Sequence, residues 1–155
     1  FVFIKRKIPW AEAFNIPVAF ALYYIGFTML GYSNGSTLGI FDVVGIILFV
    51  AGSCINTLAE LLRYNWKKNA ANNGHLYTEG LFKYSMHINY FGDLLWVSGY
   101  ALVTGNIYSA LIVAFLFCFF AFYNIPMLDK HLSVKYFDEF NGYKRKTKKL
   151  IPFVY

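Results

Sequence analysis

The sequence predicts an all-α integral membrane bundle of about four transmembrane helices, with a C-terminal amphipathic helix on its basic face. Hydrophobic residues make up 58% of the 155 residues and charged residues only 14%, whereas a soluble domain carries about 25% charged residues. Long uncharged stretches occupy residues 13–41, 43–59 and 94–128. Because a bilayer core needs about 20 apolar residues per helix, the first two stretches each hold one span and the third completes two.

The distribution of basic residues sets the orientation of these spans. All 14 Lys and Arg residues fall on one side of the four-span arrangement: Lys5, Arg6, Lys7, Arg63, Lys67, Lys68, Lys83, Lys130, Lys135, Lys144, Arg145, Lys146, Lys148 and Lys149. The turns on the other side, residues 31–38 and 104–106, contain none. This asymmetry follows the positive-inside rule, so we expect the functional site on the basic side.

The first two spans are expected at residues 15–31 and 41–68. Pro17 falls in the first turn of the first span, where a missing N–H costs least. A cluster of Gly, Ser and Asn at residues 31–36 predicts the turn that follows. The second span has no helix breaker, so it should extend beyond the bilayer on the basic side.

The second half of the chain predicts two further spans and a surface helix. The third span should start around Leu81 and end before Thr104, and the fourth should cover residues 107–124, just ahead of Pro126. We expect residues 128–146 to form one amphipathic helix on the basic face, because apolar side chains recur there every four positions. These side chains are Leu132, Tyr136 and Phe140. The whole chain, residues 1–155, is expected to be a single domain.

Composition also excludes several classes of function. The net charge of +6 comes without a recognition motif, so we expect attraction to lipid headgroups or to a phosphate-bearing ligand and no binding to nucleic acid. Cys54 and Cys118 fall inside predicted spans and provide no disulfide framework. The three histidines have no metal-ligand spacing, so no metal site is expected. Because the chain begins with Phe1 rather than Met, we expect further sequence upstream.

A first polar group lies on the second predicted span. Its members are Asn56, Glu60, Arg63 and Lys67, and their spacing of i, i+4, i+7 and i+11 places them on one helical stripe. An amide and a carboxylate at membrane depth usually have a partner or a ligand, because leaving them unpaired is costly. The alternative is an ion pair between Glu60 and Arg63 within the helix, with Lys67 extended to the interface.

A second polar group lies where the third span begins, and a third group follows the fourth span. The second contains His87, Asn89, Tyr90 and Asp93, which packing alone would hardly satisfy in a membrane span; the alternative is a structural polar network. The third contains Asp129, Lys130, His131, Tyr136, Lys144, Arg145 and Lys146. By itself, the third group is typical of a solvated helix on a membrane surface.

These groups, in this order, resemble the C-terminal half of the steroid 5α-reductase family, which shares a superfamily with isoprenylcysteine carboxyl methyltransferases. The resemblance begins at Asn56 and runs to the end of the chain. It includes residues 77–84 (Tyr-x-x-Gly-Leu-Phe-x-Tyr), residues 89–93 (Asn-Tyr-Phe-Gly-Asp), residues 99–102 and residues 150–153. The reductases instead carry an Asp at Glu60, an Arg at Lys67 and a Glu at Asp93.

The resemblance implies that the chain is a membrane-embedded reductase that uses NADPH to reduce a C=C bond of a steroid, sterol or other lipid. The cofactor-binding residues it implies are Asn56, Glu60, Arg63, Lys67, Asn89, Asp93, Tyr136 and Arg145. The catalytic residue stays open, with His87 and Tyr90 as candidates for proton transfer. In the reductases, the pair that polarises the substrate carbonyl lies in an N-terminal half that this chain does not contain.

Two alternatives remain at this point. Residues 86–90 (Met-His-Ile-Asn-Tyr) resemble the Arg-His-Pro-Asn-Tyr motif of the methyltransferase branch, which would use S-adenosylmethionine on a lipid or prenylcysteine. The loss of Arg and Pro from that motif also fits a non-catalytic subunit of a larger membrane complex, which would bind partner subunits and no cofactor. For localisation, the resemblance favours the endoplasmic reticulum, and the topology fits a mitochondrial inner membrane or a bacterial membrane equally well.

Overall fold

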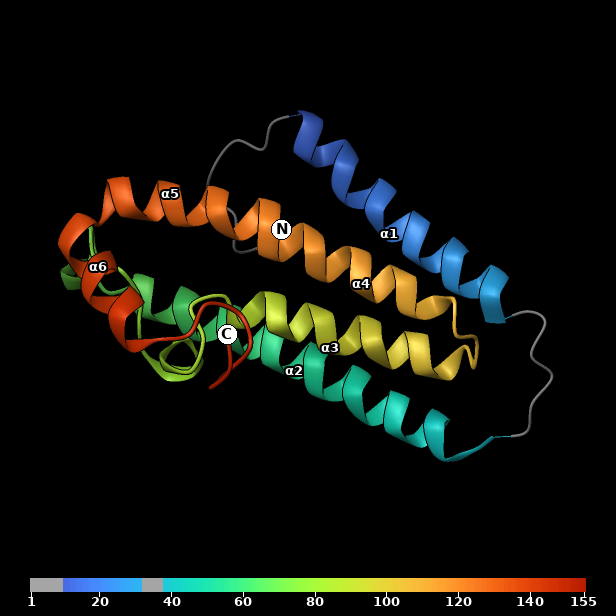
Figure 1. The fold of residues 1–155 in the computed structure, drawn as a ribbon. Coiled ribbons are helices and arrows are strands. Elements are labelled where there is room, and N and C mark those ends of the chain that lie inside the picture. Colours follow the sequence, from blue (N-terminus) through green and yellow to red (C-terminus); the bar gives the residue numbers. More distant parts are fainter. Residues whose placement is uncertain (1–9, 32–37) are drawn as a thin grey trace.

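The computed structural model describes residues 10–31 and 38–155, and the regular elements in these ranges are all helical. Four helical segments run side by side in alternating directions (Figure 1): α1 (Trp10–Gly31), α2 (Ile40–Lys67), α3 (Ile88–Val103) and α4 (Ser109–Phe119). The other elements are the 3-10 helices η1 (Ala70–Asn72) and η2 (Gly80–Lys83), the π-helix η3 (Phe120–Asn124), α5 (Ile125–Lys135) and α6 (Phe137–Lys146). The predicted all-α bundle is confirmed.

Two of these segments are long and apolar enough to cross a membrane within the described residues. They are α2 and the continuous helical stretch from Ser109 to Lys135. Helix α3 has 16 residues, fewer than the roughly 20 that a straight crossing needs. The predicted start of this span at Leu81 is wrong, because α3 begins at Ile88. The backbone N–H groups of Met86 and His87 donate to the carbonyls of Lys148 and Lys149 and not to a preceding helical turn.

The basic residues of the described ranges gather at one end of the bundle. This end holds the last turns of α2, the two 3-10 helices, α5, α6 and the C-terminus (Figure 1). At the other end, residues 38–40 and 103–109 contain no Lys or Arg. Lys5, Arg6 and Lys7, which were expected on the basic side, lie outside the described residues.

Helices α2 and α3 pack backbone to backbone at four glycines. A Cβ added at Gly52 would lie 2.5 Å from the carbonyl oxygen of Gly92, and a Cβ added at Gly99 would lie 2.4 Å from that of Gly45. Small residues allow this close approach between membrane helices, where packing has to replace the hydrophobic effect. The contact places the polar side chains of α2 within reach of those of α3.

The fourth helical segment continues past Pro126, which corrects its predicted end at residue 124. Pro126 lacks the N–H that an α-helix would use for its bond to the preceding turn. The π-helix η3 directly precedes α5 and absorbs this interruption, as π-bulges do. The single helix predicted at 128–146 is also wrong, because the chain bends at Tyr136 (φ −129°, ψ 40°) and divides it into α5 and α6.

The C-terminal segment (residues 147–155) lies against the residues that lead into α3. The backbone N–H groups of Met86 and His87 donate to the carbonyls of Lys148 and Lys149 at 2.8 and 3.0 Å. Leu150 is fully buried in the core beside α3 and α4. These contacts hold the first turn of α3 against the basic end of the bundle.

Candidate functional site

Four polar side chains connect α2 to α3 and form what we call the polar ladder: Asn56, Glu60, Asn89 and Asp93. Asn56 Nδ2 donates to Asp93 Oδ1 at 2.5 Å and lies 3.4 Å from the carbonyl oxygen of Asn89. One turn further along, Asn89 Nδ2 donates to Glu60 Oε1 at 3.2 Å. The polar groups that the sequence places on the second span and at the start of the third span therefore contact each other.

Each carboxylate of the ladder has a second partner on its own helix. Arg63 donates to Glu60 Oε2 at 2.5 Å, as the alternative reading of this stripe expected. Trp96 Nε1 donates to Asp93 Oδ1 at 2.9 Å. Both pairs are three residues apart, which is a neighbouring position on a helix surface. The intrahelical pair and the contact between the helices thus exist together.

The polar ladder has a cavity on each side. Toward the basic end, a cavity of about 90 Å³ is lined by Arg63, Lys67, His87, Asn89 and Tyr136 among others. Toward α1, a cavity of about 300 Å³ is lined by Asn56 and Asp93 together with Ser53, Thr57 and the aromatic rings of Phe20, Tyr24, Phe49 and Trp96. One side of the ladder is thus cationic, and the other is largely aromatic.

His87 and Tyr90, the two candidates for proton transfer, belong to a buried stack. His87 is 2% exposed, and its Nε2 lies 2.9 Å from Asp129 Oδ1 on α5. Its ring stacks on Tyr90, with centroids 5.7 Å apart, and Tyr90 stacks on Phe120 at 4.5 Å. The contact with Asp129 holds the imidazole ring in one orientation at the wall of the smaller cavity.

The remaining two predicted cofactor residues lie in different places. Tyr136 lines the smaller cavity at the junction of α5 and α6, with Lys135 Nζ 5.0 Å from the centre of its ring. Tyr136 therefore lies beside the polar ladder. Arg145 is exposed on α6 and is not among the residues that line either cavity. Phe140 and Tyr143 are the buried residues of α6, and Arg145 lies on its exposed face.

A second set of contacts attaches the loop before η2 to α6. Glu139 accepts a hydrogen bond from the Leu76 backbone N–H at 2.7 Å and lies 2.6 Å from His75 Nδ1. The Leu76 amide and the His75 side chain together lower the pKa of Glu139. Tyr143 donates its hydroxyl to the Phe82 carbonyl at 2.6 Å, and burial raises its pKa. These contacts hold the segment from His75 to Phe82 against α6.

Sequence reasoning missed two features of the site. It placed Asp129 in a solvated surface group, and no spacing could pair it with His87, which lies 42 residues away. It also passed over the glycines at positions 45, 52, 92 and 99, although their repeated interval of seven residues on both helices was a usable signal. These glycines set the separation across which the polar ladder forms.

Comparisons with known proteins agree with the resemblance. Residues 13–147 match the model of a family described as a protein of unknown function (DUF1295). The 3-oxo-5-alpha-steroid 4-dehydrogenase 1 of Macaca fascicularis is 30% identical over 113 residues, or 73% of this chain and 41% of that protein. The Rattus norvegicus enzyme of the same name is 27% identical over 149 residues, or 88% of this chain and 56% of that protein.

A relative from the methyltransferase side also matches. The probable O-methyltransferase ustE of Ustilaginoidea virens is 38% identical over 90 residues, or 57% of this chain and 32% of that protein. The chain thus spans between about a third and just over half of the length of these curated relatives. Because the family model covers most of the chain, the chain belongs to the steroid 5α-reductase-like family DUF1295.

Proposed function

We propose that this protein is a membrane-embedded reductase that uses NADPH to reduce an activated C=C bond of a steroid, sterol or other lipid. The observation that carries the proposal is the polar ladder, which brings two amides and two carboxylates together between a cationic cavity and an aromatic one. The similarity to 3-oxo-5-alpha-steroid 4-dehydrogenases supports the same reaction class.

The residues around the ladder fit the chemistry of a dinucleotide. Amide and carboxylate groups pair with carboxamide and ribose hydroxyl groups, and Arg63 and Lys67 supply the cations that pair with phosphate. The aromatic side chains that line the cavity on the other side of the ladder can pack against a planar ring of the ligand. Ligand pockets usually measure about 300–1,000 Å³, so the cavity of about 300 Å³ beside Asn56 and Asp93 falls at the lower end of that range.

Bound NADPH would supply the hydride for the reduction of the double bond, and the second carbon would need a proton. The chain contributes binding, orientation and electrostatics. Asn56 and Asp93 would orient the ring, whereas Arg63 and Lys67 would hold the phosphate end. His87, oriented by Asp129, and Tyr90 are the two candidates for donating this proton, because a histidine ring and a phenol can each transfer a proton.

A methyltransferase that uses S-adenosylmethionine is the second candidate. The match to a probable O-methyltransferase favours it, as do His87, Asn89 and Tyr90, which stand where that branch carries the same residues. In this reading the same ladder would hold the amino-acid and ribose groups of the cofactor. The two candidates differ in their cofactor, and cofactor binding therefore separates them.

Ligand protection of the purified protein tests both candidates. We expect NADPH to raise the thermal midpoint of unfolding, because a ligand that binds only the folded state stabilises it. Asp93→Asn should remove this protection, whereas Glu79→Gln, which changes an exposed carboxylate outside the ladder, should keep it. Protection by S-adenosylhomocysteine instead would replace the reductase with the methyltransferase. If neither ligand protects the protein, both enzyme proposals fail and a non-catalytic subunit is the better description.

For localisation, we propose that α1, α2 and the stretch from Ser109 to Lys135 cross the membrane of the endoplasmic reticulum, and that the shorter α3 crosses it packed against α2. The basic end would then lie in the cytosol. The two segments that are long and apolar enough to cross a membrane support this topology. The absence of Lys and Arg from the turns at the end of the bundle opposite the basic end also supports it. Single cysteines introduced at Asn106 and Lys144 test it, because a membrane-impermeant thiol reagent added from the cytosol should label only the second. Labelling of both positions, or of Asn106 alone, would refute it.

A further inference from the structure

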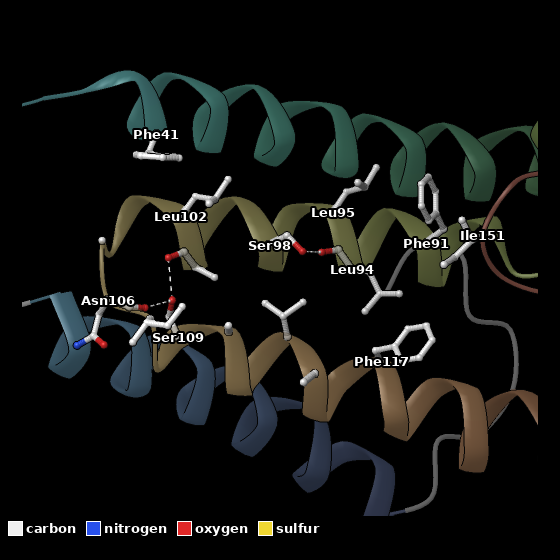
Figure 2. A pocket seen from close by; sticks show the side chains of 16 residues that line it. Phe41, Phe91, Leu94, Leu95, Ser98, Leu102, Asn106, Ser109, Phe117 and Ile151 are labelled. Carbon is white, nitrogen blue, oxygen red and sulfur yellow. Dashed lines mark hydrogen bonds between the residues drawn. The ribbon is translucent and has the colours of Figure 1, made fainter. Parts of the chain in front are cut away.

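A long apolar groove runs between α3 and α4, away from the polar ladder. Figure 2 shows it extending from Phe91 and Ile151 at the basic end to Phe41 and Asn106 at the opposite end. Its volume is about 850 Å³, and its walls include Leu94 and Leu102 on α3 together with Ala114 and Phe117 on α4. None of the lining side chains is charged. The lining of the groove therefore matches hydrocarbon better than a charged ligand.

The polar side chains in the groove already use their hydrogen-bond donors within the protein. The Ser98 hydroxyl donates to the Leu94 carbonyl at 2.6 Å, and the Ser109 hydroxyl donates to the Ala101 carbonyl at 2.8 Å. Asn106 Nδ2 donates to the carbonyl of Leu30 at 3.2 Å. A ligand in the groove would find few donors for a polar group of its own, which favours an acyl chain over a polar molecule.

The groove is long as well as apolar. The interval from Phe91 to Leu102 alone rises about 16 Å at 1.5 Å per residue, and the groove continues beyond it to Asn106 (Figure 2). An extended acyl chain lying along the helices matches this length.

Charge is different at the two ends of the groove. Ile151 lines the basic end, and Lys148 and Lys149 precede it in the C-terminal segment, which is held by the backbone bonds to Met86 and His87. The residues around the opposite end, at 38–40 and 103–109, include no Lys or Arg. An amphiphile in the groove therefore meets cations at one end only, and an anionic headgroup is attracted to that end.

We propose that the groove between α3 and α4 binds an anionic phospholipid, with its acyl chains along the groove and its headgroup at Lys148 and Lys149. The site is separate from the polar ladder, so the proposal stands whether or not the protein is a reductase. The lipid would be a bound component of the folded protein and would cover apolar side chains on α3 and α4.

Native mass spectrometry of the purified protein tests this proposal. The protein is mixed with phosphatidylglycerol or with phosphatidylcholine that has identical acyl chains, and we expect the anionic lipid to bind more tightly. Ala114→Trp should weaken both lipids about tenfold, which corresponds to the lost burial of about two methylene groups. Phe115→Trp is the matched control, because Phe115 is 67% exposed on the same helix and does not line the groove.

A double variant, Lys148→Gln with Lys149→Gln, separates the headgroup from the chains. We expect it to reduce phosphatidylglycerol binding to the level of phosphatidylcholine and to leave phosphatidylcholine binding unchanged. Equal binding of the two lipids by the wild-type protein would overturn the assignment of the headgroup. Equal losses in Ala114→Trp and Phe115→Trp would overturn the assignment of the groove.

Photolabelling of the wild-type protein provides a measurement that needs no variant to fold. Phosphatidylglycerol with a diazirine on its acyl chain should label peptides from residues 91–117 in preference to the exposed face of α2. Labelling spread evenly over α2, α3 and α4 would indicate bulk lipid contact and overturn the proposal. A dimer that resists added lipid and dissociates in Ala114→Trp would assign the groove to a second copy of the chain instead.

Discussion

Replacing Gly52 with alanine should separate α2 from α3 and weaken the polar ladder. The added Cβ would lie 2.5 Å from the Gly92 carbonyl oxygen and from the Trp96 backbone nitrogen, and 2.9 Å from Leu95 Cβ, whereas ordinary contacts are 3.4–4 Å. Two of these three atoms belong to the backbone, so no side chain can rotate to relieve the contact. The helices must therefore move apart locally by about 1 Å, a strain of the kind that costs about 1–3 kcal/mol in a packed core.

The ladder lies one helical turn from this contact. Asn56 follows Gly52 by four residues, and its bond to Asp93 is 2.5 Å long. A separation of about 1 Å would bring this bond close to the limit of about 3.5 Å beyond which a hydrogen bond is lost. Hydrogen bonds to charged groups contribute about 1.5–3 kcal/mol. Allowing for partial loss of the bond, we expect Gly52→Ala to lower the free energy of unfolding by about 3 kcal/mol.

The assay is equilibrium unfolding in mixed micelles, titrated with a denaturing detergent and followed by tryptophan fluorescence. Gly142→Ala is the matched control, because Gly142 lies on α6 and an added Cβ there meets no atom within 4 Å. In that exposed helix the same substitution should be neutral or stabilise by up to about 1 kcal/mol. Equal stability of Gly52→Ala and the wild-type protein would refute the close packing of α2 and α3. If Gly142→Ala lowered the free energy of unfolding by the same amount, the close contact at Gly52 would not be the cause of the loss.

Two further predictions concern contacts at the basic end. Asp129→Ala should lower the free energy of unfolding by about 1–3 kcal/mol, because it leaves the buried imidazole of His87 without its hydrogen-bond acceptor. Asp129→Asn keeps an oxygen at this position and should lower the free energy of unfolding by less than half as much. Equal losses in the two variants would contradict this reasoning. For Glu139, the folded pKa lies below the ordinary value of 4.5, so its stabilising contribution is complete above that pH and is lost as the pH falls through the lowered pKa. Hydrogen exchange at the Leu76 amide, corrected for the intrinsic rate, measures this contact. In the wild-type protein, the protection factor should decrease as the pH is lowered below 4.5, whereas in Glu139→Gln it should be independent of pH. A wild-type protection factor that stays constant from pH 6 to pH 3 would contradict this prediction.

Much of the arrangement of the site could be predicted from periodicity along the chain. Asn56 and Glu60 share one helical face, and so do Asn89 and Asp93, because residues four apart lie above one another on any α-helix. Alternating helix directions then bring the two faces to the same end of the bundle, and the basic residues mark which end that is. These features depend on local backbone geometry and on the cost of burying polar groups at membrane depth, and both can be read from residue order.

Other parts of the site depend on contacts between segments that are distant in the sequence. The partner of His87 is on α5, and only the continuation of the helix through Pro126 brings Asp129 to it. The bend at Tyr136 similarly separates α6 from α5 and leaves Arg145 in solvent, away from the cavity. Spacing along the chain reports which side chains share a face of one helix. How closely two helices approach, and which faces then meet, follows from the packing of all their side chains together, and here only the tertiary structure decided it.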